Sequence, residues 1–416
     1  MGKTTEDFFK KKKDWSIAKD DLLRSYLNAY MAKLFHTHKP TIYLDCFAGA
    51  GKFGSGCVPY QEKVDGSPLI ALDAIRNAVK STKIYNPVYL ACFIEPEYYK
   101  ELETNIRLSQ HPNDKYKIYS GSYPGEIKAV ISDIEKSGDI PNLFCYLDPF
   151  GVKYLKFETF KQIRRCKLNS IELLINFNSF GFLRYACGVW KIRIKEIEID
   201  KAEEMNERDP LMNVENGDCL ARLDDVMGTS EWRRIIEDYR RDKITGYEAE
   251  SGLAALYKRQ LKQVLDFKYV LSIPIRLNES SHPKYRMVYA TNHEDGATIM
   301  GNVMRGRQDY LYEQYSMMKS GGCRGLFERE DLLVRSSVEE NVIDFLKGKG
   351  ELSGNEFFAG FYDEKFLTAK LLKVMKKLEE CNRITIRRDP ETKDNGKPFR
   401  FYTEAQGKHL YIRLNE

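Results

Sequence analysis

Four polar residues in the first half of the chain stand where apolar runs end, and their types suit the binding of a polar ligand. They are Asp45 after 41–44, Glu95 after 88–94, Ser122 after 116–119 and Asp148 after 143–147. Such runs, rich in β-branched, aromatic and aliphatic residues, predict strands buried in a parallel sheet. Because open α/β sheets bind ligands beyond the carboxyl ends of their strands, we expect the four side chains to share one edge.

The segment Asp45–Gly51 is typical of a strand that runs into a glycine turn. Gly49 and Gly51 let the backbone turn sharply and approach a ligand closely. Residues 49–54 formally fit a dinucleotide fingerprint, but the next acidic strand end, Glu95, comes far later than the ~20 residues which that motif expects. A phosphate-binding P-loop is excluded because residue 46 is Cys where the motif needs Gly.

The pattern that remains is the Asp-x-Phe-x-Gly-x-Gly turn of S-adenosylmethionine-dependent methyltransferases, matched by Asp45, Phe47, Gly49 and Gly51. In this interpretation Asp45 holds the ammonium group of the cofactor, directly or through water. Glu95 accepts both ribose hydroxyls, and the loop at Ser122 passes the adenine. The alternative is a glycine turn that binds no ligand.

The candidate for chemistry is the segment Asp148–Gly151, which reads Asp-Pro-Phe-Gly. Many methyltransferases of exocyclic amino groups have Asp/Asn-Pro-Pro-Tyr/Phe at this place. There the carboxylate and the proline carbonyl orient the amine, and the aromatic ring stacks on the base, which assigns these roles to Asp148, Pro149 and Phe150. Phe150 comes one residue early, so adenine or cytosine methylation stays open. The alternative is an Asp-Pro turn that begins the next helix.

The elements needed to position these residues predict a doubly wound α/β sheet. Strands are expected at 41–44, 88–94, 116–119, 143–147, 171–177, 269–275 and 285–290, with helical patterns between the first five. We expect an N-terminal helical segment at 1–40 and a class I methyltransferase-like domain at 41–310. A helical and charged insertion at 179–265 is a natural place for a substrate lid. A strand at 190–197 and a loop at 53–64 beside the cofactor are also expected.

Residues 41–190 and 265–310 resemble the three-Cys-motif partner protein family. The matching features are the Asp45–Gly51 turn, 66–69, Glu95, 146–151, 174–177, 290–293, Gly296 and Met300. The resemblance implies a Rossmann-fold, methyltransferase-like protein that associates with a separate iron–sulfur protein of the radical type. The nine cysteines of this chain lack Cys-x-x-Cys spacing, so such a cluster must belong to the partner.

A linker at 311–334 leads to a predicted small domain at 335–416. We expect helices at 337–347, from a Ser353 cap through Phe358, and at 366–380, followed by strands at 383–387 and 399–402. Three helices and a basic hairpin are the order of a winged helix, a helix-turn-helix variant that reads nucleic acid. Its candidate contacts with DNA or RNA are Lys370, Lys373, Lys377, Arg387, Arg388 and Lys397. A winged helix that binds protein is the alternative.

Composition predicts an intracellular enzyme, which we expect to be cytoplasmic. Scattered cysteines without a secretory segment indicate reduced thiols, and no apolar run is long enough to cross a membrane. No metal site is expected, since the six histidines include no His-Glu-x-x-His. The predicted function is methyl transfer from S-adenosylmethionine to nucleic acid. The alternative is a non-methylating, nucleic-acid-binding partner subunit of a three-Cys-motif protein.

Overall fold

The described residues of the computed structural model form two compact units. The first unit ends at Asn292 and the second begins at His293. The structure describes residues 14–53, 64–192, 194, 216–275, 283, 285–320, 337–365, 370–393, 395–404 and 407–415. Most of the expected strand at 190–197 and of the expected loop at 53–64 lies outside them. Within them, no helix has both the length and the apolar character needed to cross a membrane.

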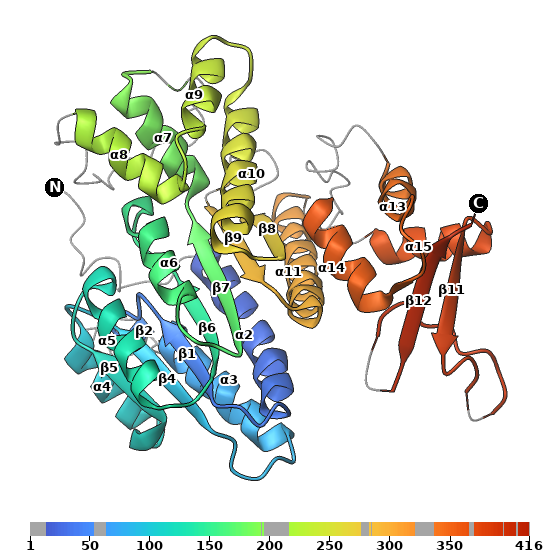
Figure 1. Ribbon diagram of the computed structural model, residues 1–416, viewed down its shortest axis with the longest axis horizontal. Helices are drawn as coiled ribbons and strands as arrows, with labels where there is room; N and C mark the ends of the chain where they lie inside the picture. The colour runs from blue at the N-terminus through green and yellow to red at the C-terminus, as the bar shows by residue number, and fades with distance from the viewer. Residues whose placement is uncertain are drawn as a thin grey trace. The chain divides into compact units, whose positions relative to one another are not determined.

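The first unit is a mixed α/β structure around a seven-stranded sheet in the order β5-β4-β1-β6-β7-β9-β8 (Figure 1). The strands are β1 (Thr41–Asp45), β4 (Tyr89–Ile94), β5 (Tyr116–Tyr119), β6 (Asn142–Leu147), β7 (Ser170–Phe177), β8 (Tyr269–Ile275) and β9 (Tyr285–Thr291). The first five run parallel, and β9 is antiparallel to both of its neighbours. The seven strands predicted for this sheet are confirmed.

Helices connect the parallel strands, as parallel pairing requires. The connecting helices are α3 (Ser67–Ser81), α4 (Tyr99–Leu108), α5 (Tyr123–Lys136) and α6 (Phe157–Arg164). Helix α2 (Asp14–Phe35) precedes β1, and α7 (Ser179–Val189), α8 (Asn216–Met227), α9 (Trp232–Arg240) and α10 (Gly246–Leu265) lie between β7 and β8. A short hairpin of β2 (Lys52–Phe53) and β3 (Val64–Asp65) follows the glycine turn. The described part of the predicted insertion after β7 is mainly helical, and α7, α8 and α9 lie beyond the end of β7 (Figure 1).

The two faces of the sheet have different side chains, since residues alternate along each strand. One face is aliphatic and packs in a single core with α5, α6 and α10. The other face is aromatic and lies under α2. There the ring of Phe144 lies 5.6 Å from Tyr26, 5.4 Å from Tyr30 and 6.0 Å from Tyr43. Helix α2 is therefore anchored to the centre of the sheet by tilted aromatic contacts.

The second unit contains α11 (Glu294–Ser320) and a bundle of three shorter helices with a small sheet. The helices are α13 (Val338–Leu346), α14 (Gly354–Glu364) and α15 (Leu371–Glu380), and the sheet has the order β10 (Leu352–Ser353), β12 (His409–Leu414), β11 (Ile384–Asp389). The cap predicted at Ser353 is confirmed as a capping box with Glu356. Helix α11 packs against α14, where the Tyr362 hydroxyl donates to Asn302 at 2.9 Å.

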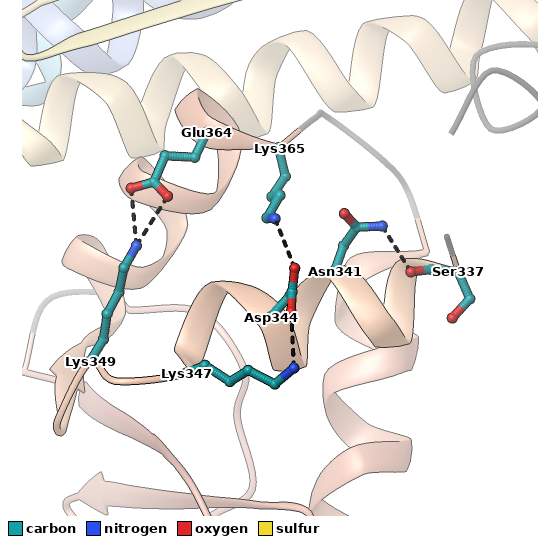
Figure 2. Close-up of polar contacts among 7 residues, drawn as sticks. All are labelled: Ser337, Asn341, Asp344, Lys347, Lys349, Glu364 and Lys365. Atoms are coloured by element: carbon teal, nitrogen blue, oxygen red, sulfur yellow. Dashed lines mark hydrogen bonds and ion pairs between the residues drawn. The ribbon is translucent and has the colours of Figure 1, made fainter. Parts of the chain in front are cut away.

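Charged side chains of α13 and of the residues after it form ion pairs with side chains at the end of α14 (Figure 2). Lys349 donates to Glu364 at 3.0 Å. Asp344 accepts from Lys347 at 3.1 Å and pairs with Lys365 at 3.7 Å. Three lysines of the second unit thus pair with carboxylates of the same unit.

Two predictions for the second unit are wrong. Helix α14 continues past Phe358 to Glu364. Residues 399–402 form no strand, and the strand that pairs with β11 is β12. The reason is burial: Leu410 and Ile412 of β12 are fully buried and alternate with outward-facing residues. The rings of Phe399 and Phe401 instead pack edge to face, with centroids 5.0 Å apart.

Candidate active site

The glycine turn after β1 has the backbone conformation that the sequence predicts. Gly49 and Gly51 have φ values of 62° and 78°, in the left-handed region that favours glycine. A Cβ added at Gly51 would lie 2.9 Å from the Leu102 side chain. The Gly49 N–H donates to the Glu95 carboxylate at 2.8 Å, so the turn is tied to the end of β4. The structure thus brings two of the predicted cofactor-binding segments together.

Asp45 is the last residue of β1, and its side chain is fully buried. It accepts hydrogen bonds from the Phe47 N–H at 3.1 Å and from the Tyr43 hydroxyl at 3.4 Å. Burial raises the pKa of Asp45 to about 7, and the nearby Asp148 charge adds to this, although the hydroxyl of Ser67 and the other donors oppose the rise. Near neutral pH this carboxyl group therefore changes its charge readily.

Glu95 follows β4 and is also buried. Its carboxylate accepts the N–H groups of Glu97 at 2.9 Å and Tyr98 at 3.0 Å in addition to that of Gly49. An ionised carboxylate has about four acceptor positions, so one remains for another donor. The predicted pairing with two ribose hydroxyls requires at least one backbone donor to give way.

Ser122 and Phe47 lie on either side of the start of α5. Ser122 is the N-cap residue of α5, but its side chain makes no capping hydrogen bond. The half-buried ring of Phe47 lies 5.1 Å from Tyr123 and 5.7 Å from Tyr154. Phe47 therefore packs against an aromatic group beside the turn.

Asp148 follows β6 and is held by three side chains. Lys19 of α2 donates to its two oxygens at 2.7 and 2.5 Å, and the Asn176 amide of β7 donates at 2.6 Å. The Tyr146 hydroxyl is 3.3 Å away. The ammonium of Lys19 also lies 5.2 Å from the centre of the Tyr285 ring of β9. Four elements thus meet at this carboxylate.

The rest of the Asp-Pro-Phe-Gly segment points away from the core. Pro149 is half-buried, and Phe150 is 61% exposed, as few large apolar side chains are in the described part of the chain. Gly151 is extended, and a short 3-10 turn begins at Val152. The segment does not begin a regular α-helix directly, so its turn does not have the simple helix-starting role that we considered.

Sequence reasoning missed Lys19, the residue nearest to the predicted catalytic carboxylate. No local pattern marks it, because its contact joins residues 129 positions apart. The sequence does contain a repeated tripeptide at the two strand ends: Tyr-Leu-Asp closes β1 at 43–45 and spans the end of β6 at 146–148. The two strands are neighbours, with Asp45 opposite Tyr146. The repeat places two identical tyrosine–carboxylate pairs side by side.

A second buried ion pair connects the helical insertion to the sheet. Arg286 of β9 donates to both oxygens of Glu250 in α10, at 2.7 and 2.8 Å, and the Ser179 hydroxyl at the start of α7 donates to the same carboxylate. Arg286 lies opposite Phe177, the last residue of β7. The pair therefore fixes the insertion at the edge where the acidic strand ends meet.

Another buried carboxyl group lies on the aromatic face under α2. Glu172 of β7 accepts from the hydroxyls of Tyr26, Tyr289 and Thr291, the last at 3.3 Å. Burial raises the pKa of Glu172 to about 7, and these hydrogen bonds oppose the rise. Glu172 is near the start of β7, whereas the candidate site is at the strand ends.

The predicted nucleic-acid contacts in the second unit divide into two groups. Three of them form ion pairs within the unit: Lys377 with Glu339 at 2.6 Å, Arg387 with Glu351 at 2.7 Å and Arg388 with Glu379 at 2.6 Å. The Arg388 side chain is only 9% exposed, which indicates a structural role. Lys370, Lys373 and Lys397 are exposed, and so are Lys377 and Arg387 despite their ion pairs.

In the part of the chain that the structure describes, no cluster of His, Cys, Asp and Glu is arranged to hold a metal ion. No family model matches this chain. A search of curated proteins also finds no match. Among solved structures, the chain is similar to a loganic acid methyltransferase with SAH, at 10% identity and a TM-score of 0.26, over 98% of this chain and 99% of that chain. Because a TM-score of 0.26 supports no conclusion about function, the function has to be inferred from the residues of the site.

Proposed function

We propose that this chain is an S-adenosylmethionine-dependent methyltransferase that acts on nucleic acid, at an amino group of a base. The observation that supports this most is the pairing of two acidic strand ends at one edge of a seven-stranded sheet. Asp45 ends β1 and leads into a glycine turn, and Asp148 follows the neighbouring strand. Such an edge is where open α/β sheets bind their ligands. The sheet is consistent with a methyltransferase-like fold of class I.

The chemistry of the donor set fits this cofactor. S-adenosylmethionine carries a sulfonium and an ammonium, and carboxylates stabilise cations nearby. Asp45 and Asp148 provide such groups, and the left-handed Gly49 and Gly51 keep side chains away from the turn. The cofactor supplies the methyl group carried on its sulfonium. Asp45 and Glu95 would hold it, with Phe47 and Ser122 beside it.

The residues after β6 would orient the substrate. Asp148 and the carbonyl of Pro149 accept the N–H groups of the amine, and the exposed ring of Phe150 offers a face on which a base can stack. Asp148 already accepts from Lys19, Asn176 and Tyr146. A substrate amine must therefore share this carboxylate or displace one of its donors.

The second unit would recognise the nucleic acid as a winged helix. Its helix, strand, helix, helix, strand, strand order supports this interpretation. Lys370, Lys373 and Lys397 are exposed and can reach a phosphate, whereas Arg388 is enclosed in its pair with Glu379. Binding through these residues should weaken steeply with salt.

The test is calorimetric titration of the full chain with S-adenosylmethionine, beside the Asp45→Ala variant. We expect micromolar binding that the variant loses. The protein that binds is then given a radiolabelled cofactor with DNA and RNA pools. A folded wild type that binds no cofactor contradicts the whole proposal. A wild type that binds the cofactor but labels neither pool contradicts the proposed substrate.

A specific observation favours a second candidate, a non-methylating partner subunit that delivers nucleic acid to a three-Cys-motif iron–sulfur protein. The acceptor positions of Asp148 are taken by the chain itself, and those of Glu95 are largely taken by backbone N–H groups. Co-purification of a protein with iron–sulfur absorbance, together with nucleic-acid binding and no methyl transfer, would establish this candidate.

A further inference from the structure

Three carboxylates and one ammonium lie together at the ends of β1 and β6. Asp45 and Asp148 belong to the strands, whereas Lys19 and Asp20 belong to α2 and are both buried. Burial raises the pKa of Tyr146, and the charges of these three carboxylates raise it further, so all three act on one ring. The group therefore has an excess of negative charge when its carboxylates are ionised.

Lys19 supplies the positive charge in this group. Its ammonium contacts both oxygens of Asp148, and only 10% of its side chain is exposed. The Tyr285 ring covers it from β9, at 5.2 Å from the ring centre. Water screens a charge poorly when it is enclosed in this way. A ligand bound at the strand ends thus experiences the field of Lys19 as well as that of the carboxylates.

We propose that Lys19 is a specificity-determining residue that sets how strongly the site prefers a cationic ligand over its neutral counterpart. The inference rests on the proposed function and concerns the cofactor. S-adenosylmethionine has a positively charged sulfonium, and S-adenosylhomocysteine, its product after methyl transfer, has a neutral thioether in the same place. Lys19 repels only the first. Lys19 therefore reduces the difference between the affinities for S-adenosylmethionine and S-adenosylhomocysteine, so that the product competes more effectively with the cofactor.

The charges predict a clear direction for each substitution. Lys19→Met removes a positive charge and should raise the preference for S-adenosylmethionine over S-adenosylhomocysteine about tenfold. Asp148→Asn removes a negative charge and should lower that preference by a similar factor. The double variant removes both partners, so its preference should return close to the wild-type value.

The experiment measures the dissociation constants of both ligands by calorimetry for these variants of the full chain. We would work at about pH 8.5, above the pKa of Asp45, so that this carboxylate keeps its charge in every variant. A loosened site lowers both affinities together, whereas a change of field alters their ratio. Lys33→Met, a substitution in the last turn of the same helix, is the matched control and should leave the ratio unchanged.

If Lys19→Met fails to fold, the comparison of Asp148→Asn with the double variant still isolates Lys19, and the same tenfold change in the ratio is expected. If both variants fold and the ratio of the two dissociation constants is the same in each, the proposed role of Lys19 is wrong, whereas the proposed function stands. A folded wild type that binds neither ligand overturns both. Methyl-transfer activity is not needed for any of these readouts.

Discussion

The strand ends of β1 and β6 share a tripeptide, an edge and a sheet face, but their carboxyl groups have different partners. Asp45 is fully buried, and its donors are neutral backbone and hydroxyl groups. Asp148 is partly exposed and forms an ion pair with Lys19. Burial raises the pKa of Asp45 to about 7. The difference teaches that the role of an acidic strand end depends on the helix that covers it more than on its own sequence.

The largest expected effect concerns the pH dependence of stability at Asp45. Its pKa is about 7 in the folded chain and near 3.8 in an unfolded one. Between these values the unfolded chain loses a proton that the folded chain keeps, so stability falls as the pH rises through this window. The expected loss is roughly 4 kcal/mol.

Asp45→Asn imitates the protonated form and should remove this loss. Urea unfolding from about pH 4 to pH 8 measures it, and the variant should gain on the wild type as the pH rises. The control is Glu172→Gln on the same sheet face, since the pKa of Glu172 is also raised to about 7 by burial. The stability of Glu172→Gln relative to the wild type should also rise with pH, but its cofactor binding should not change. If the stabilities of Asp45→Asn and wild type change with pH in parallel, the pKa of Asp45 is not raised by burial.

Next in size is the loss of stability when the ion pair of Asp148 is broken. Lys19→Met leaves a largely enclosed carboxylate without its cation and should cost about 3 kcal/mol. Adding Asp148→Asn removes that uncompensated charge and should recover most of the loss. A double-mutant cycle by urea unfolding measures the coupling. Additive effects would mean that Lys19 and Asp148 are independent and that the contrast with Asp45 is not electrostatic.

The contrast can also be tested through turnover. If Asp148 orients the amine, Asp148→Ala should lower methyl transfer about hundredfold, because it removes the acceptor that positions the amine. Cofactor affinity should change much less. The rate of a single turnover at saturating cofactor is the measurement, and Phe150→Ala, which removes the exposed ring, should raise KM more than it lowers kcat. Full activity in Asp148→Ala would assign the residue to structure alone.

These tests concern contacts that the sequence could reveal only in part. The strands were predictable because each is a buried apolar run bounded by turn residues, and the glycine turn followed from Gly49 and Gly51. The partner of Asp148 was not, since Lys19 reaches it through the packing of α2 on the sheet, far away in sequence. The same limit applies in the second unit, where Arg388 looked like a nucleic-acid contact but pairs with Glu379. Charge in a sequence does not show which charges neutralise each other.

The smallest expected effect separates the two strand ends at the level of one hydrogen bond. Tyr43 and Tyr146 each donate to the carboxyl group two residues later, at 3.4 and 3.3 Å. Tyr43→Phe should destabilise the fold by about 1 kcal/mol above the pKa of Asp45, because that buried carboxylate loses one of few donors. The Tyr43 bond also lowers the pKa of Asp45, so the substitution should move it above about 7. Tyr146→Phe should matter less, since Asp148 keeps Lys19 and Asn176. Carboxyl titration of Asp45 by NMR measures this shift, and urea unfolding of both variants compares their stabilities. Equal losses of stability would show that the ion pair does not protect Asp148.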